Sequence, residues 1–200
     1  EQQVATMKEH DVPDWYIDSC NKIKYMFPRA HAVAYTMMSF RMAWYKVYYP
    51  QEFYATYFTT KVANFDAETI LKGKDAILAK MDEIDAKGTN AAPKEKDDYT
   101  IYEVAYEMYA RGYEFTPARL GKSLATKFSV DNGKVLLPFV AIEGVGENAA
   151  KAFQSEYEIK EFDTVEEAVK RAKLNRTAVE GLRNHGVFEG LAETDQLSMF

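Results

Sequence analysis

A short turn, Ile142-Glu143-Gly144-Val145-Gly146-Glu147-Asn148-Ala149-Ala150, carries the residues whose types and spacing are best suited to chemistry. Gly144 and Gly146 tolerate a positive φ or the close approach of another backbone. Because the pattern predicts a helix over 147–154, several backbone N–H groups are left without intrahelical partners at its start. Such amides, together with the helix dipole, can bind phosphate.

The turn resembles the hairpin of the helix-hairpin-helix motif of DNA-binding proteins, whose amides hold a backbone phosphate without reading bases. The resemblance implies positioning of duplex DNA with no sequence readout. A second, degenerate copy follows at 174–182, and in this motif family paired copies grip both strands. An ordinary helix C-cap followed by a turn is the alternative. The residues implied to bind DNA are Gly144, Val145, Gly146, Asn148, Lys151 and Arg176.

The distribution of charge matters more than its sum. The net charge of −6 at pH 7 does not favour a nucleic-acid binder. However, the stretch 19–51 contains five basic residues and no acidic one. Cys20 is the only cysteine, so no disulfide can form within the chain, and we expect a reducing, cytoplasmic location.

The sequence predicts neither a catalytic residue nor a metal site. The three histidines lie far apart without ligand spacing, and no phosphate-binding loop, nucleophile elbow or strand-borne carboxylate pair is found. Asp97 and Asp98 are interpreted as charges that precede a helix over 100–111 and complement its dipole. The first residues include neither an initiator Met nor a signal sequence, which suggests a piece of a longer protein.

The region 22–35, Lys-Ile-Lys-Tyr-Met-Phe-Pro-Arg-Ala-His-Ala-Val-Ala-Tyr, and the aromatic stretch after it up to Ala55 resemble the fingers of bacterial C-family replicative DNA polymerases. In that family the helix lies over the incoming nucleotide. From the residues alone, a helix over 28–49 is apolar nearly all round, which predicts burial, and a core histidine is the alternative role for His31. The uncharged part of this helix is too short to span a membrane. The resemblance implies nucleotide-binding roles for Lys22, Lys24, Arg29, His31 and Tyr35.

The last five residues, Gln196-Leu197-Ser198-Met199-Phe200, resemble the peptide by which bacterial polymerases bind the sliding clamp. Because the chain stops there, the likeness is to the PolC type found in Gram-positive bacteria. A frayed terminus is the alternative. The implied clamp-binding residues are Gln196, Leu197, Met199 and Phe200.

These motifs require a mainly α fold. Fingers helices are expected first, followed by a small β-hairpin around 131–134 and a helix-hairpin-helix duplex-binding domain. The expected domains are 1–112 (part of the fingers), 113–191 (duplex binding) and 192–200 (a flexible clamp-binding tail). Further helices are expected at 14–26, 51–61, 66–71, 75–86, 164–172 and 176–184.

The resemblance implies the C-terminal portion of a replicative DNA-directed DNA polymerase. Its partners would be duplex DNA, an incoming deoxynucleotide triphosphate and the sliding clamp. No cofactor is expected on this piece, and the Mg²⁺ ions of the full enzyme would be bound by aspartates elsewhere, so the piece alone would be inactive. The alternative is a non-catalytic helix-hairpin-helix adaptor that recruits the clamp to duplex DNA.

Overall fold

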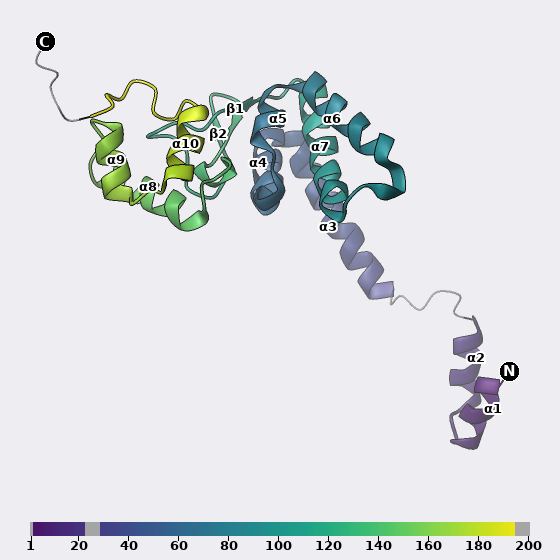
Figure 1. Cartoon of the computed structure of the whole chain (residues 1–200). Coiled ribbons are helices and arrows are strands. Elements are labelled where there is room, and N and C mark those ends of the chain that lie inside the picture. The colour runs from purple at the N-terminus through teal and green to yellow at the C-terminus, as the bar shows by residue number, and fades with distance from the viewer. Residues whose placement is uncertain (1, 23–28, 195–200) are drawn as a thin grey trace, which may run out of the picture. The chain divides into compact units, whose positions relative to one another are not determined.

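The computed structural model describes residues 2–22 and 29–194 (Figure 1). The chain forms two compact units, 1–43 and 44–200. The described part is mainly helical with one small sheet, which confirms the predicted fold class. None of the helices in these described ranges is long and apolar enough to cross a membrane.

The first unit contains α1 (Gln2–Glu9), α2 (Asp14–Lys22) and most of α3 (Arg29–Tyr48). Asp14 opens α2 with an acidic side chain in the first turn, where it complements the helix dipole. Ile17 is the buried residue of α2. The helix was expected to continue to Met26, and residues 23–26 lie outside the described ranges.

The predicted burial of α3 is wrong for the described chain. None of its residues is buried, and Tyr35 and Phe40 are 62% and 75% exposed. Apolar residues on every side of a helix show that it can be buried, but another surface must supply the cover.

The second unit is built around α4 (Pro50–Thr60), which begins with its proline in the first turn. Tyr54 and Phe58 are fully buried. The Phe58 ring lies 5.0 Å from that of Phe115, and the rings of Phe65 and Phe128 are 4.8 Å apart. Aromatic rings at such distances make favourable edge contacts. This cluster brings together residues from before and after position 112, the predicted domain boundary.

The helices α5 (Ala67–Leu71), α6 (Lys74–Lys87) and α7 (Pro93–Ala110) follow, and α6 packs along α7. The predicted start of α7 at Thr100 is wrong. The helix begins at Pro93, and the Glu95 carboxylate accepts a hydrogen bond from the Ala92 amide. Proline at the first position and a carboxylate two residues later stabilise a helix start, so Asp97 and Asp98 lie within the helix and do not precede it.

The sheet consists of β1 (Phe115–Thr116), β2 (Ser129–Asp131) and β3 (Lys134–Leu136) in the order β1-β3-β2. The predicted hairpin is confirmed, because β2 and β3 are antiparallel with Asp131 opposite Lys134. Asn132 and Gly133 between them both have positive φ, as a tight two-residue hairpin turn requires. The parallel pairing of β1 with β3 was not predicted.

After the sheet come a 3₁₀ turn, η3 (Phe139–Ala141), and the helices α8 (Glu147–Ile159), α9 (Val165–Ala172) and α10 (Arg176–Asn184). The helix α8 extends beyond its predicted end at Gln154. Phe153 of α8 is fully buried, and its ring lies 5.0 Å from that of Phe139 and 5.4 Å from that of Phe162. One hydrophobic core continues from α4 to the residues after α10.

Candidate nucleic-acid interface

The first candidate hairpin, Ile142–Gly146, joins η3 to α8. The buried Val145 anchors it to the core, and the Val145 amide donates to the Ile142 carbonyl at 3.1 Å. Gly146 is the N-cap of α8 and provides no side-chain cap. The amides of Gly146, Glu147 and Asn148 have no acceptor among the described residues, and all three residues are exposed. This helix start therefore offers donors to an external acceptor.

The two glycines of this hairpin are needed for different reasons. Gly144 has φ +84°, and a Cβ there would lie 2.8 Å from Thr177 Cγ2 and 2.9 Å from the Thr177 carbonyl oxygen. Gly146 has φ −70°, so a positive φ is not required at this position. A Cβ on Gly146 would meet no heavy atom within 4 Å. Gly144 thus serves packing, whereas Gly146 leaves its surroundings open.

The second candidate hairpin, Lys173–Asn175, joins α9 to α10 in the same layout. Lys173 takes the left-handed conformation, Leu174 is buried, and Asn175 is the N-cap. The Asn175 Oδ1 atom accepts from the Ala178 amide at 2.8 Å. Here the N-cap side chain satisfies an amide at the helix start, which the glycine cap of the first hairpin cannot do.

The first hairpin lies against α10, the helix that follows the second hairpin. Gly144 approaches Thr177, and a Cβ on Gly181 of α10 would collide with the Glu143 carbonyl oxygen and approach Ile142 Cγ2 at 3.2 Å. Only glycine permits this approach of α10 to the first hairpin.

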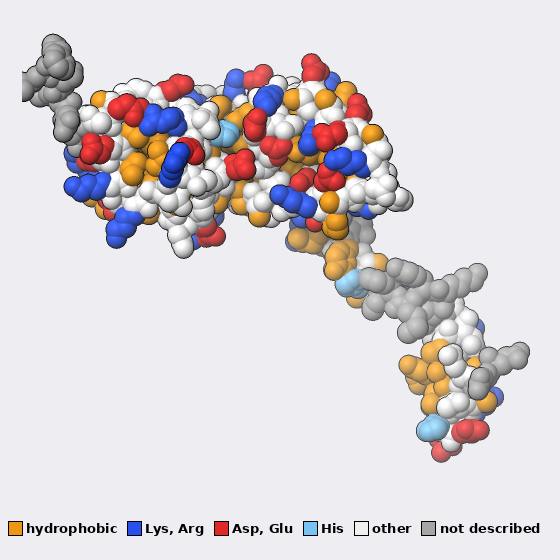
Figure 2. Space-filling model, in the orientation of Figure 1, with side chains coloured by type: hydrophobic (Ala, Val, Ile, Leu, Met, Phe, Trp, Pro, Cys, Tyr) orange, Lys and Arg blue, Asp and Glu red, His pale blue; other side chains and the backbone are white. Residues whose placement is uncertain are grey.

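The cations predicted to bind DNA are partly neutralised within the protein. Lys151 Nζ lies 2.5 Å from Glu147 Oε1, and Arg176 Nε lies 2.8 Å from Glu180 Oε1. The hydrogen bond from Lys151 holds the pKa of Glu147 below its usual value. Figure 2 shows acidic and basic side chains interspersed over this part of the surface. These two cations are therefore engaged with carboxylates, whereas the amides of Gly146, Glu147 and Asn148 have no acceptor among the described residues.

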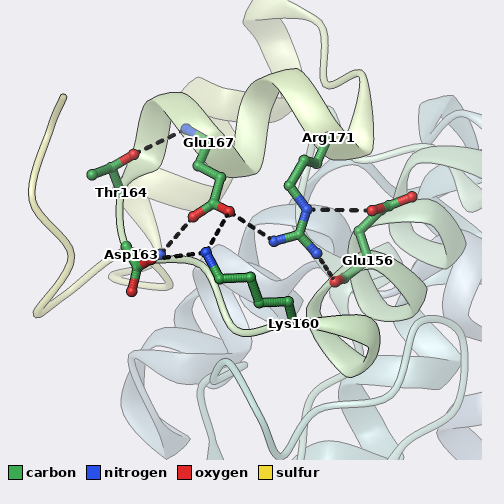
Figure 3. A network of polar contacts seen from close by, with 6 residues as sticks. All are labelled: Glu156, Lys160, Asp163, Thr164, Glu167 and Arg171. Atoms are coloured by element: carbon green, nitrogen blue, oxygen red, sulfur yellow. Dashed lines mark hydrogen bonds and ion pairs between the residues drawn. The ribbon is translucent and has the colours of Figure 1, made fainter. Parts of the chain in front are cut away.

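A polar network braces the helices that carry the hairpins (Figure 3). The Glu167 carboxylate accepts from the Asp163 amide at 2.8 Å, from Lys160 Nζ at 3.2 Å and from Arg171 Nη1 at 3.0 Å. The hydrogen bond from the Asp163 backbone N–H, together with the one from Lys160, lowers the pKa of Glu167 to about 2. Arg171 also binds Glu156 near the end of α8. Sequence reasoning missed this network, although Thr164 and Glu167 have capping-box spacing.

Among the described residues, two of the predicted nucleotide-binding residues, His31 and Tyr35, lie in contact. His31 and Tyr35 lie one turn apart on α3, with ring centroids 4.2 Å apart. Lys22 is the last residue of α2, and Arg29 is the first of α3. Lys24 lies outside the described residues.

The predicted clamp-binding residues, Gln196, Leu197, Met199 and Phe200, also lie outside the described ranges. The predicted start of a flexible tail at residue 192 needs correction. The carbonyl oxygens of Ala192 and Glu193 accept hydrogen bonds from the amides of Val165 and Glu166, at 2.9 and 3.2 Å. The chain is therefore fixed through Glu193, because its backbone satisfies the first amides of α9.

Within residues 2–22 and 29–194, no group of three or more His, Cys, Asp or Glu side chains is placed to hold a metal ion.

Comparison with known proteins finds two kinds of similarity. A family model described as a helix-hairpin-helix motif matches residues 112–197. The chain is 50% identical over 200 residues to a DNA polymerase III PolC-type from Clostridium perfringens, and 48% identical over 200 residues to one from Caldanaerobacter subterraneus. It is 47% identical over 194 residues to the Bacillus subtilis protein of the same name. These matches cover 97 to 100% of the chain but 14% of each relative.

Proposed function

The chain belongs to the PolC-type DNA polymerase III family, and from this premise we propose that it is part of a replicative DNA polymerase and grips duplex DNA for it. One observation carries the proposal. Three exposed amides at Gly146, Glu147 and Asn148 have no acceptor among the described residues, and they lie within the region that matches a helix-hairpin-helix motif. Phosphate oxygens are suitable acceptors for amides at a helix start.

Binding to duplex DNA would not depend on base sequence, and its affinity would be only moderately sensitive to salt. Backbone amides contact phosphates and carry no sequence information. Lys151 and Arg176 already have carboxylate partners, so few counterions would be released per bound duplex. The alternative of an adaptor without polymerase function receives less support, because the similarity to polymerases extends over the whole chain.

A duplex titration tests this proposal. Labelled duplexes of unrelated sequence are titrated with the chain at several salt concentrations, and we expect equal affinities. Gly146→Val should weaken binding to all of them, because the added side chain occupies the open space at the cap. Lys80→Ala, which removes a cation on α6 outside the matched region, is the control. A preference for one sequence, or full binding by Gly146→Val, would contradict the proposal.

We also propose that α3 lies over the incoming nucleotide in the longer polymerase. His31 and Tyr35 would line the nucleotide pocket, and Lys22, Lys24 and Arg29 would face the triphosphate. The shared face of His31 and Tyr35 on an exposed helix supports this assignment. We assign the Mg²⁺ ions of nucleotidyl transfer to parts of the longer protein outside this chain, so the chain alone should not polymerise.

The third proposal is that Gln196–Phe200 binds the sliding clamp. Leu197, Met199 and Phe200 would each contribute roughly 1.5–3 kcal/mol on burial, before the cost of ordering the peptide. A synthetic peptide covering residues 192–200 should bind the clamp. A peptide lacking Leu197 and Phe200 should bind at least tenfold more weakly, and equal binding by the two peptides would contradict the proposal.

A further inference from the structure

The last turn of α3 lacks one of its own hydrogen bonds. The helix ends at Tyr48, and Pro50 begins α4 two residues later. In an α-helix the carbonyl of residue 46 accepts from the amide of residue 50, but proline has no N–H to donate. Arg111, which directly follows α7, supplies a replacement, because its Nη2 atom donates to the Lys46 carbonyl oxygen at 3.2 Å.

Four residues, Lys46, Tyr54, Glu107 and Arg111, form what we call the α3 anchor. Arg111 Nη1 donates to the Tyr54 hydroxyl oxygen at 3.0 Å, and that hydroxyl donates to Glu107 Oε2 at 2.7 Å. Lys46 Nζ lies 2.9 Å from the same carboxylate oxygen. Burial raises the pKa of Tyr54 to about 12, and the hydrogen bond to Glu107 acts in the same direction, so the hydroxyl keeps its proton. Both the backbone and the side chain of Lys46 are thus held by residues at the end of α7.

The α3 anchor is more than an exposed ion pair, which would contribute little. Tyr54 is fully buried. The side chains of Lys46, Glu107 and Arg111 are 35%, 38% and 32% exposed. Charge-assisted hydrogen bonds that share atoms in a partly buried network strengthen one another and fix direction as well as distance. The last turn of α3 therefore cannot tilt without stretching several bonds at once.

We propose that the α3 anchor is a positioning device for the incoming nucleotide, and that Tyr54, Glu107 and Arg111 fix the direction of α3 without touching the nucleotide. The inference rests on the proposed function, in which His31 and Tyr35 line the nucleotide pocket. These three anchor residues are positioning residues, because they would act on the nucleotide only through α3.

The length of α3 makes its direction matter. The helix is continuous from Arg29 to Tyr48. His31 and Lys46 are fifteen residues apart, which corresponds to about 22 Å along the helix axis. A tilt of roughly 10° at Lys46 would move His31 by about 4 Å at that distance. If α3 sampled several directions, only the fraction of molecules with the competent direction would bind nucleotide, and the apparent Kd would rise by the inverse of that fraction.

Steady-state kinetics of single-nucleotide incorporation by the full-length polymerase test the inference. Arg111→Ala removes the donor to the Lys46 carbonyl and should raise the nucleotide KM about fivefold or more. Tyr54→Phe keeps the buried ring, loses only the hydroxyl and should raise the KM about threefold or more. In both variants, kcat at saturating nucleotide and the Kd for duplex DNA should change less than about twofold, because bound nucleotide selects the competent direction of α3.

Tyr102→Phe is the matched control. Tyr102 is also a buried tyrosine whose hydroxyl donates to a carboxylate at 2.7 Å, but that carboxylate belongs to Asp66, the N-cap of α5. Thermal unfolding measures the stability that each variant loses. We expect the KM of Tyr102→Phe to stay within about twofold of the wild-type value. An equal KM rise in Tyr102→Phe and Tyr54→Phe would show a general effect of lost stability and would overturn the inference, as would an unchanged KM in both anchor variants.

The variants His31→Ala and Tyr35→Ala, measured alongside, separate this inference from the proposed function. If they leave KM and kcat unchanged, the nucleotide-binding role of α3 is refuted, and the inference is refuted with it. If they alter the kinetics while Arg111→Ala and Tyr54→Phe do not, the α3 anchor is only a structural contact and the proposed function stands.

Discussion

At the scale of single residues, Gly144 and Gly146 have separate roles in one turn. Gly144 combines a left-handed backbone with contact to Thr177, so its lack of a side chain is a requirement of the fold. Gly146 has an ordinary backbone conformation and open surroundings, so its lack of a side chain serves access. Stability and DNA binding should respond to the two positions in opposite ways.

We therefore expect Gly144→Ala to destabilise the chain by about 1–3 kcal/mol, the cost of a strained backbone, with any clash against Thr177 in addition. Gly146→Ala should cost less than about 1 kcal/mol, because alanine is only a poorer N-cap than glycine. Urea unfolding of the two variants checks this. Equal losses of stability would show that Gly146 is also a structural glycine.

Glu167 should make the stability of the chain sensitive to acid. Its folded-state pKa, about 2, lies below its unfolded value of 4.5, so its stabilising contribution is complete above pH 4.5. The contribution is lost as the pH falls from 4.5 towards 2, when the carboxylate is protonated. Glu167→Gln should lower Tm at pH 7 and approach the wild-type Tm near pH 2. A Tm difference independent of pH would rule out an electrostatic origin.

At the scale of elements, the three helices that follow the sheet begin in two different ways. Thr164 and Asn175 cap α9 and α10 with side-chain oxygens, whereas α8 begins at Gly146 without a side-chain cap. Among these three helices, the one without a side-chain cap follows the glycine hairpin. The start of α8 therefore lacks the side-chain acceptor that the other two helices have, and in the proposed function phosphate oxygens would take that role.

Asn175→Ala should destabilise the chain by about 0.5–2 kcal/mol, because the Ala178 amide loses its acceptor. Asn175→Ser keeps a side-chain oxygen at the cap and should stay close to the wild type. Thermal unfolding of both variants measures the difference. If serine proved as damaging as alanine, the hydrogen bond to Ala178 would not be the source of the stabilisation.

At the scale of the whole molecule, the apolar helix α3 is exposed in a chain that spans 14% of the length of its relatives. His31 and Tyr35 lie on this helix, with their ring centroids 4.2 Å apart. Kinetics and stability measured together in a longer polymerase would distinguish the proposed nucleotide-binding role from a packing role.

In the full-length polymerase, His31→Ala or Tyr35→Ala should raise the nucleotide KM or lower kcat, with duplex affinity nearly unchanged. Phe40→Ala, on the same exposed helix but outside the predicted pocket, is the matched control. Single-nucleotide incorporation measures the kinetics, and thermal unfolding measures stability. Loss of stability with unaltered kinetics would instead support a packing role.

The sequence by itself determined the features that depend on neighbouring residues. The turn at Asn132 and Gly133 was predictable because its backbone requires two residues that tolerate positive φ. The bounds of α9 and α10 were predictable because their capping residues lie beside the apolar pattern. The glycine hairpin was also recognisable, because its pattern lies within a few neighbouring residues. The helix-hairpin-helix motif to which it belongs could therefore be identified from sequence.

Only the tertiary structure decided which distant segments meet. The pairing of β1 with β3, the approach of Gly181 to Glu143 and the attachment of Glu193 to Arg183 each join residues that no local periodicity relates. The exposure of α3 belongs here too, because burial depends on a second surface as well as on apolar residues. Local hydrogen bonding and φ preferences act between neighbours in sequence, whereas packing selects among surfaces that come together only when the chain folds.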